Sequence, residues 1–394
     1  MLEKTIRGSQ RYWGWLLFLL VLMGIGLGAY LYQFFVGLKI TGMSRDVSWG
    51  FYIAQLTYLV GVAAGGVMVV LPYYLHDYKA FGRITILGEF LAIAAVIMCM
   101  LFVFVDVGQP ARIMNVIVHP TPNSILFWDM TVLSVYLLLN IVVGWNVLSA
   151  ERKGIHYQKW VKVLAYVSIP WAFSIHTVTA FLYAGLPGRH YWLTAIMAAR
   201  FLSSAFAAGP ALLLLLCLIV RKVSRFDPGK EALRTLGGVV AYAFTINVFF
   251  YLLELFTAFY SQIPGHMHPI QFLFGGLEGY TYMAPWMWTA TGFAVVALIL
   301  LIVPATRRNL DTLAVGCVAV IISTWIDKGL GLIIGGFTPN PFERVTPYWP
   351  TLPEMAISIG VFATGFFILT VLYKMAIGVK EEAAGVSYYG AGTR

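Results

Sequence analysis

Apolar residues run along this chain in long stretches, and polar residues gather in the shorter segments between them. A stretch of about 20 apolar residues is long enough to cross the hydrocarbon layer of a membrane as a helix. Ten stretches reach that length, and they cover residues 12–37, 49–75, 84–105, 124–148, 160–184, 200–220, 235–260, 285–304, 310–334 and 354–377. The pattern therefore predicts an all-α integral membrane protein with ten transmembrane helices.

The composition supports this prediction, because 60% of the residues are hydrophobic and only 11% are charged. Such a chain has too few polar residues to cover the surface of a soluble particle. The first stretch is about 25 residues long and lacks a small-residue cleavage site, so we expect a retained helix and not a cleaved signal. We therefore treat residues 1–394 as one polytopic membrane domain.

Lysine and arginine are divided unequally between the two sides of the predicted helices. The side that holds both termini carries 19 of the 26 Lys and Arg residues. The other seven are Lys39, Arg45, Arg112, Arg189, Arg200, Lys328 and Arg344. Because cytoplasmic loops are enriched in these residues, we expect a protein of the cytoplasmic (inner) membrane with both termini in the cytoplasm. The net charge of +9 follows from this bias, so we expect the basic loops to face anionic lipid and infer no nucleic-acid partner.

Ionisable residues inside the predicted helices are the strongest candidates for function, since each costs roughly 2.5–3.5 kcal/mol near a helix centre. They are Glu89, Asp129, His176, Glu254, Asp327 and Lys328, with Asp106 at a helix end. At about 1.5 Å per residue, His176 lies roughly 12 Å and Asp129 roughly 8 Å from the outer ends of their helices, so they could share a cavity. Structural roles stay open: His176 could bond Ser174 or a carbonyl. Asp327 and Lys328 cannot face each other in a helix and could pair with other helices.

The histidines and cysteines lack the spacing of a redox centre. A transmembrane b-type haem normally has two histidine ligands on facing helices, and only His176 of the seven histidines lies well inside a predicted helix. Cys99, Cys217 and Cys317 are far apart and form no CxxC motif. We therefore expect no haem, no iron–sulfur cluster and no metal site in this chain.

The loops on the side with few basic residues are long and rich in Pro, Gly, His and aromatic residues. Their sequences are TGMSRDVSWG, DVGQPARIMNVIVHPTPNS, GLPGRHYWLTAIMAAR, SQIPGHMHPIQFLFGGLEGYTYMAP and GGFTPNPFERVTPYWPTLPE. A single Trp or Tyr there fits an ordinary interfacial belt. Five such loops on one face suggest a docking surface for a partner outside the cytoplasm.

Small residues recur at four-residue spacing in several predicted helices. They are the pairs Gly24/Gly28, Gly61/Gly65 and Gly331/Gly335, and the AFAAGPA segment at 205–211. This spacing lets helix backbones approach closely, so we expect tight helix packing at these positions.

Several motifs together resemble one known family. They are DVSWGFYIAQLTYLVGVAAGG (46–66), DVGQPARIMN (106–115), SILFWDM (124–130), SIHTVTAFLYAGLPGRHYW (174–192), RFLSSAFAAGPAL (200–212) and HPIQFLFGG (268–276). In this order, and over nearly the whole chain, they resemble the NrfD or polysulfide-reductase family of membrane subunits. Within it, the IHTVTAF and PGRHYW segments are most similar to DsrP, which belongs to the sulfite-reduction-associated DsrMKJOP complex.

The resemblance implies two four-helix bundles, formed by helices 2–5 (49–184) and helices 6–9 (200–334), with helix 1 (12–37) and helix 10 (354–377) beside them. It implies a subunit without redox cofactors of its own that is not catalytic alone. Such a subunit exchanges electrons between menaquinone or menaquinol and a periplasmic, ferredoxin-like iron–sulfur subunit. Further cytochrome and membrane subunits belong to the same complex, which in the DsrP branch serves sulfite or sulfate respiration.

The resemblance also implies a quinone site in the first bundle, near the face where the iron–sulfur partner docks. The matching positions are Ser48, Trp49 and Tyr52 in the second helix and His176 in the fifth. A histidine can hydrogen-bond a quinone carbonyl and exchange a proton near neutral pH. Asp129 could return a proton to His176, and Trp49 or Tyr52 could pack against the quinone ring.

If the chain also moves protons across the membrane, the candidate residues are Glu89, Asp106, Glu254 and Asp327. Intramembrane carboxylates in two bundles would also be natural in a secondary transporter or an ion channel. Against that alternative, no helix is obviously broken by Gly or Pro at matching places in the two halves, and no internal repeat is evident. A passive anchor of a complex is a third hypothesis, and it would leave His176 and Asp129 dispensable.

Overall fold

The computed structural model describes residues 3–383, and its regular elements in that range are helices. Ten helical spans are long and apolar enough to cross a membrane. Their bounds are α2 (Gln10–Val36), α3 with α4 (Phe51–Gly65, Val67–Leu75), α5 (Thr85–Asp106), α7 (Ile125–Arg152), α8 (Lys159–Ala184), α9 (Met197–Val223), α10 (Lys230–Ser261), α12 (Ala284–Ile302), α14 with α15 (Leu310–Thr324, Leu332–Phe337) and α16 (Leu352–Ala383). The predicted all-α membrane architecture is confirmed, and each span overlaps its predicted stretch.

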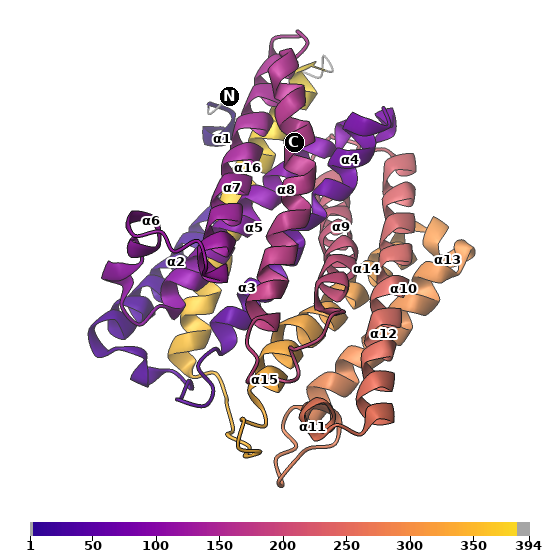
Figure 1. The fold of residues 1–394 in the computed structure, drawn as a ribbon. Coiled ribbons are helices and arrows are strands. Elements are labelled where there is room, and N and C mark those ends of the chain that lie inside the picture. Colours follow the sequence, from indigo (N-terminus) through magenta and orange to yellow (C-terminus); the bar gives the residue numbers. More distant parts are fainter. Residues whose placement is uncertain (1–2, 384–394) are drawn as a thin grey trace.

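Short helices lie between or beside the spans. They are α1 (Glu3–Ile6), α6 (Asn115–Val118), α11 (Pro264–Phe274) and α13 (Pro304–Arg308). Pro264 and Pro304 each occupy the first position of their helix, where the missing backbone donor costs nothing. Nζ of Lys4 in α1 is 2.6 Å from Oε2 of Glu382 in α16, so the two ends of the described chain lie on one face (Figure 1).

The second to fifth spans form the first of the two predicted four-helix bundles. α3 packs against α5 and α8, and α7 packs against both of these helices. The span made of α3 and α4 is 94% buried. Its apolar residues cover all sides of the helix, which is typical of a helix enclosed by others.

The sixth to ninth spans form the second bundle. α9 packs against α10 and α14, and α12 packs against the same two helices. The two bundles meet along α3 and α9, where a Cβ atom on Gly65 would lie only 2.4 Å from Cα of Gly209. The predicted close packing of Gly65 and of the 205–211 segment is therefore confirmed.

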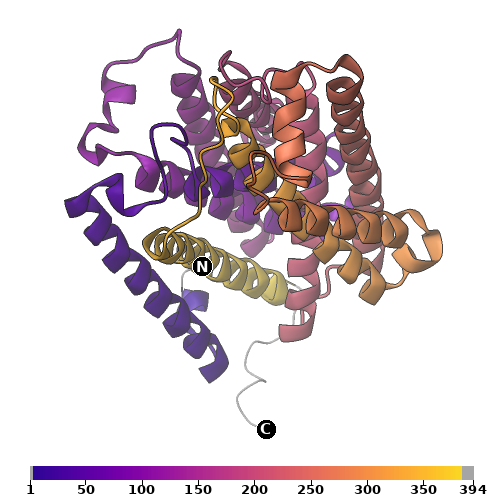
Figure 2. The same cartoon turned by 90° about the horizontal axis from the view of Figure 1, so that it is seen from below.

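The first and last spans flank the bundles, as predicted, and the structure pairs them with each other beside the first bundle. α2 packs along α16, and these are the indigo and yellow helices of Figure 2. α16 also packs against α5 and α7. Their close contact is at Gly26, where a Cβ atom would lie 2.5 Å from Cα of Gly360. The prediction for Gly24 and Gly28 is wrong, because a Cβ atom at either position would meet nothing within 4 Å. Residues two positions from Gly26 lie on other sides of the helix.

Two spans are interrupted inside the membrane-crossing length. The second span has a turn at Gly66, between α3 and α4, and the ninth span has a π-helical turn at Trp325–Gly331. The apolar pattern runs through Gly66 without a break, whereas the charged pair Asp327 and Lys328 interrupts it in the π-helical turn. A π turn is rare and often occurs at functional sites, and this one carries Asp327 and Lys328.

Candidate functional site

His176 lies in α8 and is completely buried. Its Nε2 atom is 2.7 Å from Nζ of Lys328, and its ring centroid is 5.5 Å from that of Phe201. Within residues 3–383, Nδ1 of His176 has no hydrogen-bond partner. Ser174 is not its partner, because the Ser174 hydroxyl donates to the carbonyl of Trp171 at 2.7 Å. His176 therefore has one nitrogen held by a lysine and one that is unused.

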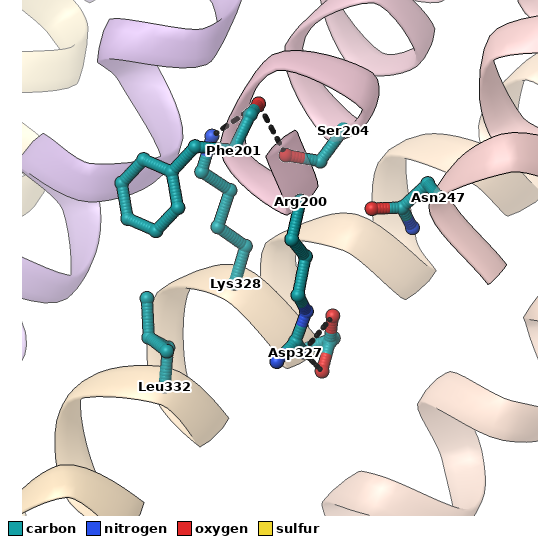
Figure 3. Close-up of a pocket in the computed structure, with 7 residues that line it drawn as sticks. All are labelled: Arg200, Phe201, Ser204, Asn247, Asp327, Lys328 and Leu332. Carbon is teal, nitrogen blue, oxygen red and sulfur yellow. Dashed lines mark hydrogen bonds and ion pairs between the residues drawn. The ribbon is translucent and has the colours of Figure 1, made fainter. Parts of the chain in front are cut away.

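Asp327 and Lys328 are neighbours in the π-helical turn and have different partners. Besides His176, Lys328 Nζ contacts the Phe201 carbonyl at 3.3 Å and lies 4.3 Å from the Phe201 ring centroid. Asp327 accepts two hydrogen bonds from Arg200 of α9, at 2.7 and 2.9 Å. Figure 3 shows the two side chains leaving the same helix, with Asp327 against the Arg200 guanidinium. The predicted pairing with other helices is confirmed.

Arg200 is the centre of a buried ion-pair network. It also bonds Glu254 of α10, and its guanidinium carbon lies 4.7 Å from the Tyr251 ring centroid. Arg200 is only 4% exposed, so its assignment to an outer loop is wrong: the first turn of α9 is enclosed by the second bundle. The formal charges of Arg200 and Lys328 balance those of Glu254 and Asp327. Removing one partner from such a network leaves an uncompensated buried charge.

Asp129 lies in α7 and is buried. Its Oδ1 atom accepts a hydrogen bond of 2.5 Å from the hydroxyl of Thr179. Thr179 follows His176 by three residues on α8, so the two side chains lie on neighbouring turns of one helix face. Because Asp129 bonds Thr179, a proton from Asp129 would reach His176 only through an intermediary.

A series of aromatic contacts connects the loops with few basic residues, which are called the outer loops below, to His176. The Trp49 ring stacks on Trp192 with centroids 6.0 Å apart and meets Tyr183 at 5.8 Å. Tyr183 meets Phe201 at 5.8 Å, and Phe201 contacts His176. Trp192 and Tyr183 are completely buried, whereas Trp49 is half-buried. Trp49 is therefore the outermost ring of a path that ends at the histidine.

Tyr52 and Ser48 have different surroundings. The Tyr52 hydroxyl donates to Gln33 of α2 at 2.7 Å, and Gln33 donates to the carbonyl of Val105 at 2.6 Å. Ser48 is exposed in the loop before α3. The hydroxyl of Tyr52 is thus turned toward the flanking helix pair.

Asp106 belongs to the surroundings of Tyr52, together with a carboxylate that was not predicted from the sequence. Asp106 and Glu354 both lie close enough to act electrostatically on Tyr52. Glu354 is completely buried and accepts hydrogen bonds from the Gly42 amide at 2.7 Å and the Tyr348 hydroxyl at 2.8 Å. Oδ1 of Asp106 has no partner in the described chain. Glu354 is the first residue of the last predicted stretch, and an acidic side chain is ordinary at the start of a helix.

Glu89 lies apart from the other carboxylates, in α5 of the first bundle. It is 3% exposed, and its Oε2 atom has no hydrogen-bond partner among the described residues. Lys380 of α16 bonds Glu151 at 2.9 Å and not Glu89. The four predicted proton-transfer residues therefore lie in three places, and Arg200 bridges only Glu254 and Asp327.

The outer loops form an ordered surface above these sites. Arg189 donates to the carbonyl of Asp46 at 3.1 Å, and its guanidinium carbon lies 4.4 Å from the Phe337 ring centroid. Burial lowers the pKa of Arg189, and the charge of Asp46 opposes that effect. The Tyr348 hydroxyl accepts a hydrogen bond of 2.6 Å from the Phe51 amide. Segments far apart in the sequence are thus fixed to one another on this face.

Comparison with known proteins identifies the family. The family model described as "Polysulphide reductase, NrfD" matches residues 39–338, which is more than half of the chain. The chain belongs to the NrfD family. This NrfD-family chain contains the predicted motifs in the matched region, and among residues 3–383 no group of three or more His, Cys, Asp or Glu side chains is placed to hold a metal ion.

Three relatives of this NrfD-family chain are matched over almost their whole length. A candidate membrane subunit of a dimethyl sulfoxide reductase from Halobacterium salinarum is 27% identical over 90% of this chain and 89% of its own. A selenate reductase subunit of Mesobacillus selenatarsenatis is 23% identical over 86% and 88%. The Hdr-like menaquinol oxidoreductase integral membrane subunit of Archaeoglobus fulgidus is 22% identical over 96% and 97%. All three are named as subunits of larger assemblies.

The pairing of Lys328 with His176 and the position of Arg200 were not predicted from the sequence. These contacts join residues that are 152 and 127 positions apart. The available signal was a charge count, since the two cations and the two carboxylates Glu254 and Asp327 are equal in number. Buried charges in a membrane protein are almost always paired, so an even balance of this kind predicts that pairs exist but not which residues form them.

Proposed function

We propose that this chain is the quinone-interacting membrane subunit of a respiratory electron-transfer complex. It exchanges electrons between menaquinone or menaquinol and an iron–sulfur subunit docked on the outer loops. The name of the Archaeoglobus fulgidus relative, a menaquinol oxidoreductase subunit, supports the quinone class. The distribution of Lys and Arg supports an inner membrane with cytoplasmic termini, which makes the docked partner periplasmic.

The unused nitrogen of His176 is the observation that carries this proposal. Lys328 has only donors, so its ammonium donates to Nε2 and leaves the hydrogen of a neutral imidazole on Nδ1. A buried N–H without a partner is costly, and a carbonyl oxygen is the group that it lacks. This unpaired N–H supports a carbonyl ligand of the quinone class at His176.

Different residues of this chain have different roles around that ring. A quinone substrate takes up two electrons and two protons when it is reduced. His176 holds the carbonyl and exchanges a proton at Nδ1. Lys328 fixes the tautomer and orientation of the imidazole, as a positioning residue. Trp49 and Tyr183 cover the outer side, so a ring contacts His176 only when one of them moves aside.

The finer assignment rests on the motifs. Their likeness to DsrP supports a complex of sulfite or other sulfur-compound respiration, with cytochrome and further membrane subunits as partners. The buried carboxylates Glu89, Asp106, Glu254 and Asp327 are the residues available for proton translocation in such a complex. We propose a complex that performs the reaction only when assembled, with its redox centres in the other subunits.

The test is quinol-linked turnover of the purified complex with wild-type chain, His176→Ala or His176→Gln. General acid–base groups typically contribute a factor of about 10²–10⁴, so His176→Ala should lower turnover by about that factor with assembly unchanged. His176→Gln should retain more activity, because an amide can both accept from Lys328 and donate to a carbonyl. Ser174→Ala on the same helix is the matched control.

Unchanged turnover in assembled His176→Ala complexes would make His176 structural. Solute or ion flux through liposomes that contain this chain alone would favour a transporter or channel. Full turnover with both His176→Ala and Asp129→Ala would favour a passive anchor.

A further inference from the structure

The second bundle contains a large cavity that the proposed function does not use. Its volume is about 760 Å³, and it lies between α10, α11, α12 and α14. Sites for small molecules usually have volumes of about 300–1,000 Å³ and are mostly apolar. The cavity therefore has the size and lining of a ligand site.

The cavity is reached from the side of the bundle that faces lipid. Leu252 and Phe259 of α10 and Trp288 and Val295 of α12 line it, and each of these side chains is exposed. α10 and α12 stand side by side at one edge of the molecule (Figure 1). A molecule dissolved in the membrane can therefore enter between these two helices.

The inner end of the cavity is polar. Asn247 is 5% exposed, and its Oδ1 atom has no hydrogen-bond partner within the described residues. The Tyr251 hydroxyl is also buried without a described partner. Asp327 lines the cavity, but both of its oxygens are bonded to Arg200. Two neutral groups at this end, the Asn247 amide and the Tyr251 hydroxyl, thus lack partners that a ligand could supply, whereas the charge of Asp327 is already paired with Arg200.

A second, much smaller cavity adjoins this polar end. Its volume of about 10 Å³ is roughly the space that one water molecule needs. Its lining consists of Arg200, Phe201, Ser204, Asn247, Asp327, Lys328 and Leu332 (Figure 3). Asn247 therefore stands between the large cavity and the ion pairs.

We propose that the large cavity binds a lipid-phase molecule of the quinone class, with its ring at Asn247 and Tyr251 and its apolar tail between α10 and α12. This site is separate from the one at His176, so the inference goes beyond the proposed function.

Charge and depth both select this class of ligand. The described lining contains no Lys, Arg or His and one carboxylate, Asp327, so a phosphate head would have no cation to bind. Asn247 is 17 residues from the start of α10 and 14 from its end, which is roughly 20–25 Å from either end of the helix. A phospholipid head remains at the membrane surface, whereas a neutral ring with carbonyl or hydroxyl groups can reach this depth.

The test is photolabelling of the purified complex in lipid nanodiscs with an azido-naphthoquinone that carries a decyl tail. The label is mapped by mass spectrometry of peptides. We expect labelling of α10 and α12, competition by unlabelled decyl-naphthoquinone, and little competition by decyl-naphthalene or phosphatidylglycerol. Ala294→Trp fills the cavity and Asn247→Leu removes the polar contact, so each should lower labelling several-fold. Ile299→Trp, on the exposed side of α12, is the matched control.

Three results would overturn the proposal: no label on α10 or α12, unchanged labelling with Ala294→Trp, or equal competition by decyl-naphthalene or phosphatidylglycerol. Equal competition by either molecule would mean that the cavity binds apolar chains without selecting a quinone ring. His176→Ala separates the two proposals, because it should lower turnover by about 10²–10⁴-fold and leave the labelling of α10 and α12 intact.

Discussion

The two bundles bury their polar residues in different ways. In the first bundle, His176 and its aromatic neighbours are enclosed on all sides, whereas Asn247 of the second bundle lines a cavity of about 760 Å³. Apolar content does not decide how much of a span is buried in either bundle. The second span and α7 of the first bundle have mean hydropathies of 1.9 and 1.9 but are 94% and 28% buried, and α10 and α12 of the second bundle, at 1.8 and 1.9, are 28% and 22% buried. Lipid tails are as apolar as leucine, so hydropathy places a helix in the membrane without deciding what surrounds it.

The ion-pair network lies where these two kinds of packing meet. Lys328 belongs to the π-helical turn and contacts His176 of the first bundle. Arg200 of the second bundle bonds Asp327 of the same turn. All four charged side chains belong to helices of the second bundle, and Lys328 carries the network to His176 of the first. This arrangement predicts the most severe effects at the boundary, intermediate effects in the tight bundle and the smallest in the open one.

The largest expected effect is that of Arg200→Ala. Its loss leaves Glu254 and Asp327 buried without a cation, which typically costs about 3–5 kcal/mol. The measurement is the free energy of unfolding of the purified chain in a denaturing-detergent titration, with Arg221→Ala as the control at a more exposed pair. Adding Glu254→Gln and Asp327→Asn to Arg200→Ala should recover part of the loss. Wild-type stability of the single variant would show that the network does not hold the boundary.

The next effect concerns the contact between α3 and α9. Gly65→Leu places a side chain against the backbone of Gly209, and overpacking of this kind costs about 1–3 kcal/mol or more. Gly24→Leu is the matched control, because a Cβ atom there meets nothing within 4 Å. The same unfolding titration should separate the two variants clearly. Equal stabilities would mean that the bundles tolerate a wider separation.

A pair of identical substitutions compares the bundles directly. Ala172 of α8 is completely buried, and Ala294 of α12 lines the large cavity. Ala172→Leu should lower the free energy of unfolding by about 1–2 kcal/mol, since a tight core has no room for three more carbons. Ala294→Leu should leave it nearly unchanged. A loss of similar size in both variants would remove the contrast in packing.

The fold could be predicted well because it depends on regular features of the sequence, such as long apolar stretches and glycines at fixed spacing. Span positions and the two bundles follow from apolar length and from motif order, and Gly65 was found because its spacing is regular. Gly26 and Glu354 were missed, since a single glycine or an acidic residue at a helix start has many ordinary meanings. The charged pair Asp327 and Lys328 lies in the π-helical turn, but no local pattern predicts the π-helical geometry or the partners of Arg200, because both depend on packing between helices that are distant in the sequence.

The candidate site shows the same division. Residue type and depth identified His176, Asp129, Glu254 and Asp327 as buried polar residues. Their partners decide their chemistry, and those partners are set by tertiary contacts such as that of Lys328. The role of His176 therefore remains a prediction for the turnover experiment, even though its burial is now described.

The smallest expected effect is a pH dependence at the outer end of the second bundle. Burial lowers the pKa of His266 in α11, and the neighbouring His190 lowers it further. The unfolded chain then protonates His266 more readily than the folded chain does. The contribution of His266 to the free energy of unfolding is therefore fully present above about pH 6.5 and declines as the pH falls below that value. The melting temperature of the purified chain should fall between pH 7.5 and 5.5, and His266→Asn should flatten the fall, whereas His119→Asn in an exposed loop should not. The shift should be small because His266 is only half-buried.

The order of local opening at low pH gives a second measurement. Because α11 lines the cavity, hydrogen exchange at low pH should rise in α10 and α12 before it rises in the first bundle. Uniform hydrogen exchange across both bundles at low pH would contradict this order.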